Sequence, residues 1–318
     1  MRRFASAVLF PLLVAAITAF AVFGATLDLA GRLGLAREIN PALLALLAIA
    51  IFYTTIAVLE RVHPYRPAWN RAQGDQRADL LHLLFSGPLS SAAFEATLRG
   101  VAVSAAAWLA AQLGVSLWPT SLPAVAQLYL AILVAEFGHY WFHRVSHESP
   151  LVWRLHATHH SAPRLYWLNA TRFHPFDLFA LIAFQNVPLI LLGAPPRVFA
   201  MYLLFSMVYG QLQHGNIELR TGALDWLFST PGLHRFHHST DPREGNANYG
   251  AILITWDLVF RSFFRPKDRA FDGRVGIADL PKFPQRYLAQ LASPFRWARV
   301  TRESRQEGDV GCVSCVAK

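Results

Sequence analysis

The chain has 318 residues, of which 54% are hydrophobic and only 15% are charged, and its formal net charge is +9. These values exclude a typical soluble domain, and apolar runs near the length that crosses a bilayer indicate a multi-pass membrane protein. A nucleic-acid-binding protein would gather its basic residues on one soluble face with exposed aromatic residues. Here the basic residues, mostly arginine, lie in loops beside apolar runs. That pattern follows the positive-inside rule and excludes nucleic acid as a partner.

Six apolar runs are predicted to be transmembrane helices. In chain order they cover residues 4–24, 41–59, 98–118, 122–142, 176–192 and 198–212. The first could instead be a signal peptide, but its apolar core would be unusually long and the following segment ATLDLA is a poor cleavage site. The segment 79–96 is also apolar but is interrupted by Gly87 and Pro88, so the sequence leaves open whether it spans the membrane. A further interruption is predicted at Pro188.

Eleven of the thirteen histidines fall in two windows, residues 139–174 and 214–238. Most of them form three sets: His139, His143 and His147; His156, His159 and His160; and His234, His237 and His238. Residues three and four apart share one helix face, so each set is expected to present its imidazoles to a single point. Imidazole is the commonest metal ligand and binds iron, zinc, copper and nickel. The sets therefore predict a metal centre.

The number of histidines indicates two metal ions. An octahedral ion is saturated by six ligands and zinc normally takes four, so eight to ten converging imidazoles are too many for one ion. Neutral imidazoles also leave the charge of two divalent ions uncompensated, so hydroxide, oxo or a nearby carboxylate is expected to contribute. The acids closest to the sets in the sequence are Glu136, Glu218 and Asp241.

Arginine-rich loops place the histidines on one side of the predicted membrane. The loop 61–77 and the segment 144–173 are rich in arginine, which predicts a cytoplasmic position, whereas the loop 116–121 has no charged residue. Every histidine set then falls at the cytoplasmic end of a span. Thr230 and Pro231 are typical of an N-cap and a first helical position, and the helix that they open carries the last set. The predicted fold is an all-α, multi-pass transmembrane protein with a di-metal site on its cytoplasmic face.

We divide the chain into N-terminal membrane helices and loops (1–97), a catalytic domain (98–265) and a polar cytoplasmic appendage with a disordered tail (266–318). The only cysteines, Cys312 and Cys315, lie in this tail. Their spacing is that of a redox motif, but no βαβ pattern surrounds them and no second pair could complete a zinc site. Their role stays open.

The text around the histidines resembles the fatty acid hydroxylase and sterol desaturase superfamily of membrane di-iron enzymes. The resemblance covers about residues 130–265 and is carried by YWFHRVSH, LVWRLHATHHS, NATRFHP, QLQHGNIEL and TPGLHRFHHSTDP. By position it implies ten metal ligands: His143, His147, His156, His159, His160, His174, His214, His234, His237 and His238. His139 looks optional. The family often has aspartate in place of Glu136 and Gly-Thr in place of Arg261 and Ser262.

This resemblance implies an O2-dependent oxidoreductase that hydroxylates or desaturates a C–H bond of a lipid such as a fatty acyl chain, a sterol or an ether lipid. It implies two iron ions, which zinc can replace in purified protein because imidazole sites bind zinc at least as tightly. No catalytic residue stands out apart from the metal ligands, and no cofactor-binding motif is visible. Electrons are therefore expected from an external donor. The donor is an electron-transfer protein or a reduced pterin, since NYG-x-x-L-x-x-WD also resembles the alkylglycerol monooxygenase branch. In a bacterium the enzyme would lie in the inner membrane.

The alternative from another functional class is a histidine-rich membrane protein that binds or transports metal without oxygenase activity. A transporter needs polar residues inside its spans to form a pathway. The predicted spans carry almost none, and the histidines gather at one end of them. The oxygenase is therefore the favoured interpretation.

Overall fold

A computed structural model describes residues 2–25, 41–115, 117–266 and 269–305. In these ranges every regular element is a helix, and strand-like pairing is limited to isolated bridges such as Pro64 with Ile217. The predicted all-α class is therefore confirmed. Cys312 and Cys315 lie outside the described residues.

Among the described residues, three helical stretches are long and apolar enough to cross a membrane: α1 (Arg2–Ala25), α3 (Pro41–Val62) and the stretch Gln76–Leu113. Many of their large apolar side chains are exposed, among them Ile51 on α3 and Trp108 in the third stretch. Such a surface requires a lipid environment, because water would make its exposure costly. The structure thus supports a membrane protein, and α1 and α3 agree with the first two predicted spans.

The stretch Gln76–Leu113 is one continuous helix, so residues 79–96 belong to a candidate membrane helix, and the span predicted at 98–118 is the second part of that helix and ends at Leu113. It consists of α4 (Gln76–Leu81), η2 (His82–Ser86), α5 (Gly87–Phe94), η3 (Glu95–Arg99) and α6 (Gly100–Leu113). Both η2 and η3 are wide π-helical turns, and η2 ends just before Pro88. A π turn shifts the hydrogen-bond register, so the helix can pass a proline. The helix ends at Leu113 because Gly114 adopts a left-handed φ of 67°.

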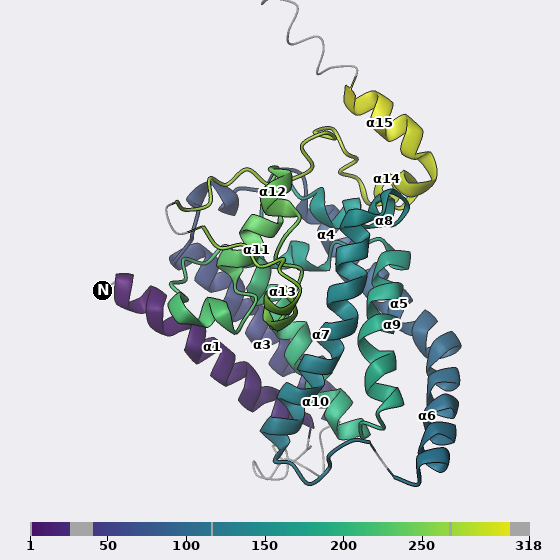
Figure 1. The fold of residues 1–318 in the computed structure, drawn as a ribbon. Coiled ribbons are helices and arrows are strands. Elements are labelled where there is room, and N and C mark those ends of the chain that lie inside the picture. Colours follow the sequence, from purple (N-terminus) through teal and green to yellow (C-terminus); the bar gives the residue numbers. More distant parts are fainter. Residues whose placement is uncertain (1, 26–40, 116, 267–268, 306–318) are drawn as a thin grey trace, which may run out of the picture.

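Three further helices form the centre of the fold: α7 (Ala124–Glu148), α9 (Pro175–Leu191) and α10 (Pro196–His214). Figure 1 shows them beside one another, and α1 packs along α10. The predicted interruption at Pro188 is absent, since α9 continues through it. Proline cannot donate to the carbonyl four residues earlier, which here belongs to Phe184. A Cβ atom on Gly138 of α7 would lie 1.8 Å from that oxygen, so only glycine permits this close contact between α7 and α9.

Short helices cover one end of this bundle (Figure 1): α8 (Pro150–His160), α11 (Pro231–His237), α12 (Pro242–Gly245) and α13 (Thr255–Val259). The chain also contains three short turns: η1 (Pro67–Asn70) between α3 and α4, η4 (Trp167–Thr171) between α8 and α9, and η5 (Gly222–Trp226) between α10 and α11. The predicted helix start is confirmed: the Thr230 hydroxyl accepts a hydrogen bond from the Leu233 N–H at 3.4 Å, and Pro231 is the first helical residue.

The C-terminal part contains α14 (Tyr287–Ala292), η6 (Ser293–Arg296) and α15 (Trp297–Arg305). It packs onto α8: Ala157 forms an apolar cluster with Ile277, Leu280, Phe283 and Val300. The described part of the predicted appendage therefore covers the helix that carries the second histidine set. The domain boundaries at 97 and 265 stay predictions.

Candidate metal centre

Nine histidines converge into two groups, and they come from α7, α8, α10 and α11. Group A contains His143, His147, His156, His160 and His237, and group B contains His159, His214, His234 and His238. Within each group one ring nitrogen from every histidine lies within 4.8 Å of the others. Eight of the nine side chains are buried, and His147 is partly buried.

Each H-x-x-H-H motif contributes to both groups, so the expectation that a set points to a single centre is wrong. On α8, His156 and His160 belong to group A and His159 belongs to group B. On α11 the division is reversed, because His237 joins group A while His234 and His238 join group B. Residues four apart share a helix face, whereas adjacent residues diverge by about 100°. The H-H pair therefore places one imidazole in each group.

In group A the rings are oriented by contacts at Nδ1. The partners are Tyr249 O for His143 (2.6 Å), Asn246 Oδ1 for His147 (3.2 Å), Asp177 Oδ2 for His156 (2.9 Å) and Ala247 O for His237 (2.8 Å). An imidazole that donates from Nδ1 presents a lone pair at Nε2. All five Nε2 atoms of group A are buried without a hydrogen-bond partner. Unpaired buried nitrogens are costly, so this donor set fits a bound cation.

In group B the nitrogens contact one another directly. His234 Nε2 lies 2.9 Å from His214 Nε2 and 3.0 Å from His238 Nε2. Two imidazoles bound at a right angle to one ion, each at about 2.1 Å, would have nitrogens about 3.0 Å apart. His214 Nδ1 contacts Asn169 Oδ1 at 3.0 Å, and His159 Nδ1 lies 3.3 Å from the Arg172 carbonyl. Group B therefore also fits a metal ion.

The imidazoles on α8 and α11 are held neutral. Burial, together with the neighbouring imidazoles, keeps the pKa of His156, His160 and His234 well below the usual value. The same causes lower the pKa of His238. Neutral histidine is the form that binds a metal.

The segment that orients group B is anchored to the start of the third membrane stretch. Arg172 donates to Asp79 (Nε to Oδ1, 2.5 Å), and the Tyr166 hydroxyl donates to Asp79 at 2.7 Å. Arg164 donates to both oxygens of Asp75, at 2.6 and 3.0 Å. Arg164 and Arg172 are buried and paired, so they are not free charges at a membrane surface. They no longer support the charge argument for a cytoplasmic position, which now depends on the other arginines.

The acid nearest to the metal ligands is Asp177, which the sequence analysis missed. It lies in the first turn of α9 and contacts His156, and its Oδ1 atom has no hydrogen-bond partner. The three acids singled out from the sequence belong to neither group: Glu136 accepts from the Ala251 N–H at 2.9 Å, and Asp241 caps α12. The one sequence signal that could have identified Asp177 was its position three residues after His174.

The remaining histidines lie outside both groups. His174 is the N-cap of α9, where its Nδ1 accepts from the Phe176 N–H and its Nε2 lies 3.2 Å from the Leu291 carbonyl. His139 lies next to His143 but contacts Gln185 at 2.9 Å. His63 and His82 are bound to other polar side chains away from the groups.

Two cavities reach the metal centre from different sides. The inner cavity, about 150 Å³, is lined by His143 and His156 of group A, by His159, His214 and His234 of group B, and by apolar residues of α9. The outer cleft, about 310 Å³, is lined by the other three group A histidines together with Trp153, Glu148 and Asp279. Group A therefore faces both cavities, whereas group B faces only the inner one.

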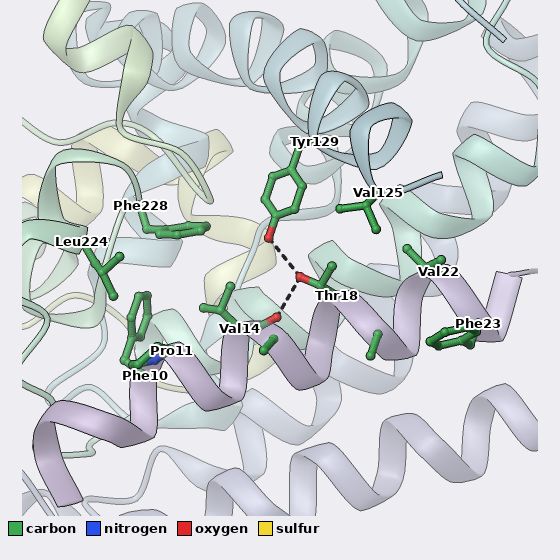
Figure 2. A pocket seen from close by; sticks show the side chains of 12 residues that line it. Phe10, Pro11, Val14, Thr18, Val22, Phe23, Val125, Tyr129, Leu224 and Phe228 are labelled. Carbon is green, nitrogen blue, oxygen red and sulfur yellow. Dashed lines mark hydrogen bonds between the residues drawn. The ribbon is translucent and has the colours of Figure 1, made fainter. Parts of the chain in front are cut away.

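A larger groove of about 520 Å³ lies away from the histidines, between α1, α7 and residues 224–228. Figure 2 shows its apolar lining, in which the Thr18 hydroxyl meets the Tyr129 hydroxyl at 2.9 Å. No titratable cluster lines it, so it offers no chemistry of its own.

Comparison with known proteins now identifies the family. The fatty acid hydroxylase model matches residues 128–262, which contain every residue of both groups. The ornithine lipid hydroxylase OlsE of Rhizobium tropici is 40% identical over 261 residues, covering 81% of this chain and 76% of that protein. The chain belongs to the fatty acid hydroxylase family. The predicted superfamily is thereby confirmed.

Alkylglycerol monooxygenases are also similar, which agrees with the resemblance at NYG-x-x-L-x-x-WD. Those of Xenopus tropicalis and Homo sapiens are 33% and 34% identical and cover 46% of this chain. The match covers only 32% of the length of each of these two proteins. No solved structure matches the chain at a significant level. Because these relatives are a lipid hydroxylase and alkylglycerol monooxygenases, they support the interpretation that this chain is an oxidoreductase that acts on lipids.

Proposed function

We propose that the chain is a membrane-bound, O2-dependent lipid hydroxylase in which groups A and B each hold one iron ion. The observation that carries the proposal is the pair of histidine groups beside a cavity with apolar walls. Bound iron would supply the redox chemistry that reduces O2. Overall, one oxygen atom enters a C–H bond and the other leaves as water, with two electrons from an external donor and two protons.

The proposed ligands are the nine grouped histidines. The tenth, His174, is left out because both of its nitrogens contact backbone groups of the C-terminal part and of α9. The protein's contribution to group A is to fix the rings, since Asp177, Asn246 and two carbonyls hold the Nδ1 atoms of four of its five histidines. Fixed rings present their lone pairs without reorganisation when the metal binds.

The inner cavity is the proposed substrate site. Phe173, Leu178 and Leu181 give it apolar walls, and such walls bind an alkyl chain and exclude bulk water. Its polar side chains, apart from the ligands, are His139, Gln185 and Gln213. The outer cleft, with Glu148 and Asp279 at its edge, is the proposed approach for the electron donor.

We further propose that the metal centre faces the cytoplasm. The support for this comes from the arginines in the loop 61–77, which, unlike Arg164 and Arg172, are not held in buried ion pairs. A membrane-impermeant thiol reagent added outside intact cells should label Thr120→Cys and leave Asp279→Cys unlabelled. The reverse pattern would place the centre outside.

The function is tested with isotopic oxygen. Cells that express the protein grow under ¹⁸O2, and their lipids are analysed by mass spectrometry against cells that express His156→Ala. We expect an ¹⁸O-labelled hydroxylated lipid only with the wild type. His63→Ala is the matched control, because this histidine is in neither group and should leave the product unchanged. If the label were equal in wild type and His156→Ala, the proposed function would be wrong.

A further inference from the structure

The inner cavity has a gap in its wall at Gly210. This residue lies on α10 one turn before His214, and both residues line the cavity. A Cβ atom on Gly210 would meet no atom within 4 Å, so the space in front of it is open. The adjacent side chains Tyr209 and Gln211 are buried. Glycine weakens a helix interior relative to alanine, so its presence here needs a reason other than helix formation.

The size of the cavity provides that reason. A water-sized group occupies about 30 Å³, so a cavity of about 150 Å³ holds roughly five such groups. A leucine at position 210 would add about four carbon-sized groups in front of the ligands and fill most of that space. An alanine would add one. The side chain at position 210 therefore decides whether a chain segment fits beside His159 and His214.

We propose that the absence of a side chain at Gly210 sets the width of the substrate cavity, so that position 210 determines which lipids are oxidised. The ligand is an unbranched apolar chain of which roughly five carbons enter the cavity. The inference rests on the proposed function, because the chain that enters is taken to be the substrate. It deepens that function by assigning specificity to one residue that binds no metal.

The cavity can be measured without activity. Gly210→Cys is made in a chain whose Cys312 and Cys315 are serine, loaded with zinc, and treated with alkyl methanethiosulfonates from methyl to decyl. Gly100→Cys is the matched control: it is also a helical glycine with no atom within 4 Å of its Cβ position, but it lies on an exposed surface. The introduced Cβ and Sγ atoms and the transferred sulfur take up about three of the roughly five groups that the cavity holds, so intact-mass spectrometry should show that position 210 rejects alkyl chains longer than about two carbons. Position 100 should accept all of them. Equal labelling by the decyl reagent at both positions would overturn the proposal.

The second measurement is the labelled lipid product of the ¹⁸O2 experiment. We expect Gly210→Leu to lower it at least tenfold with metal content unchanged, Gly210→Ala to lower it less, and Gly100→Leu to match the wild type. A Gly210→Leu protein that keeps the wild-type product would refute the specificity assignment. If the leucine variant failed to retain metal, Gly210→Ala and the reagent series would decide. A wild type that oxidises no lipid would refute the proposed function alone, since the chain-length limit is measured independently.

Discussion

Group A has five imidazoles and opens on two cavities, whereas group B has four and opens on the inner cavity alone. Their supports differ as well. Group A is oriented by the carboxylate of Asp177 and by the segment 246–249. Group B is oriented by the segment 169–172, which the buried ion pair of Arg172 with Asp79 fastens to the third membrane stretch. Two sites built from the same motifs thus have different access to water and different anchors in the chain.

The H-x-x-H-H motif is an element that the two sites share. Because each motif contributes to both groups, neither group can form without both α8 and α11. The two sites therefore share both helices, although each has its own ligands and its own supporting side chains.

Removing one ligand should have the largest effect. His156→Ala in group A and His238→Ala in group B should each lower activity by more than about 100-fold, since loss of an outer partner alone costs 10–100-fold. Group B has four ligands and should lose its ion, which leaves about one ion per chain by elemental analysis. In His156→Ala, group A keeps four of its five histidines, so this variant should retain more metal than His238→Ala does. If His238→Ala stayed active with two bound ions, His238 would not be a ligand that group B needs.

Several features of this centre could be predicted from the sequence. Helical spacing identified eight of the nine grouped histidines, and Thr230 with Pro231 marked the start of α11 because capping is local chemistry. The ninth, His214, followed from the resemblance. The division of each motif between two groups could not be predicted, because it depends on how α8 and α11 face each other. The same limit hid the contact of His156 with Asp177 and the pairing of Arg172 with Asp79, which joins residues 93 apart.

Acid should affect both groups together. The folded protein holds the pKa of His156, His159 and His237 below the usual imidazole value of about 6.5, chiefly through burial. The unfolded chain therefore binds more protons, and stability that is present above about pH 6.5 is lost as the pH falls below it. Protons also compete with the metal. Activity and bound metal, measured on one sample, should fall together and steeply. Lost activity with both ions still bound would identify another acid-sensitive group.

Changing a residue that contacts a ligand histidine but does not itself bind metal should have a smaller effect on metal affinity, and the effect should be limited to one group. Asp177→Asn keeps the shape of the side chain but replaces the carboxyl group that faces His156 with an amide. Metal affinity of group A should fall by about 10–100-fold, with group B unchanged. Titration with a competing chelator measures both affinities. Asp241→Asn is the matched control, because this aspartate caps α12 and contacts no grouped histidine. An equal loss from both groups would show that the supports are not independent.

Access to water should separate the rates at which the two ions leave. Three group A histidines line the outer cleft, while group B ligands line only the inner cavity. A hydrophilic chelator should therefore remove one ion quickly and the second slowly, in two phases of equal amplitude. Asp177→Asn should accelerate the fast phase alone. A single phase that releases both ions would mean that the cleft does not control exchange.

The smallest expected effect concerns Arg261, which follows the segment that supports group A. Arg261 adopts a left-handed φ of 62°, a conformation that costs an L residue about 1–2 kcal/mol. Glycine accepts this φ, and its greater freedom in the unfolded chain costs roughly 0.5–1 kcal/mol. The first term is larger, so Arg261→Gly should stabilise the protein slightly, by a rise in Tm of about 1 °C. Arg71→Gly is the matched control, since Arg71 is also exposed but has an ordinary φ of −88°, and it should lower Tm. Thermal unfolding of the metal-loaded protein in detergent measures both variants. If Arg261→Gly destabilised the protein as much as Arg71→Gly, the left-handed backbone at 261 would not be a source of strain. Metal affinity of both groups should stay unchanged, because Arg261 contacts no ligand and the relief is confined to the turn after α13.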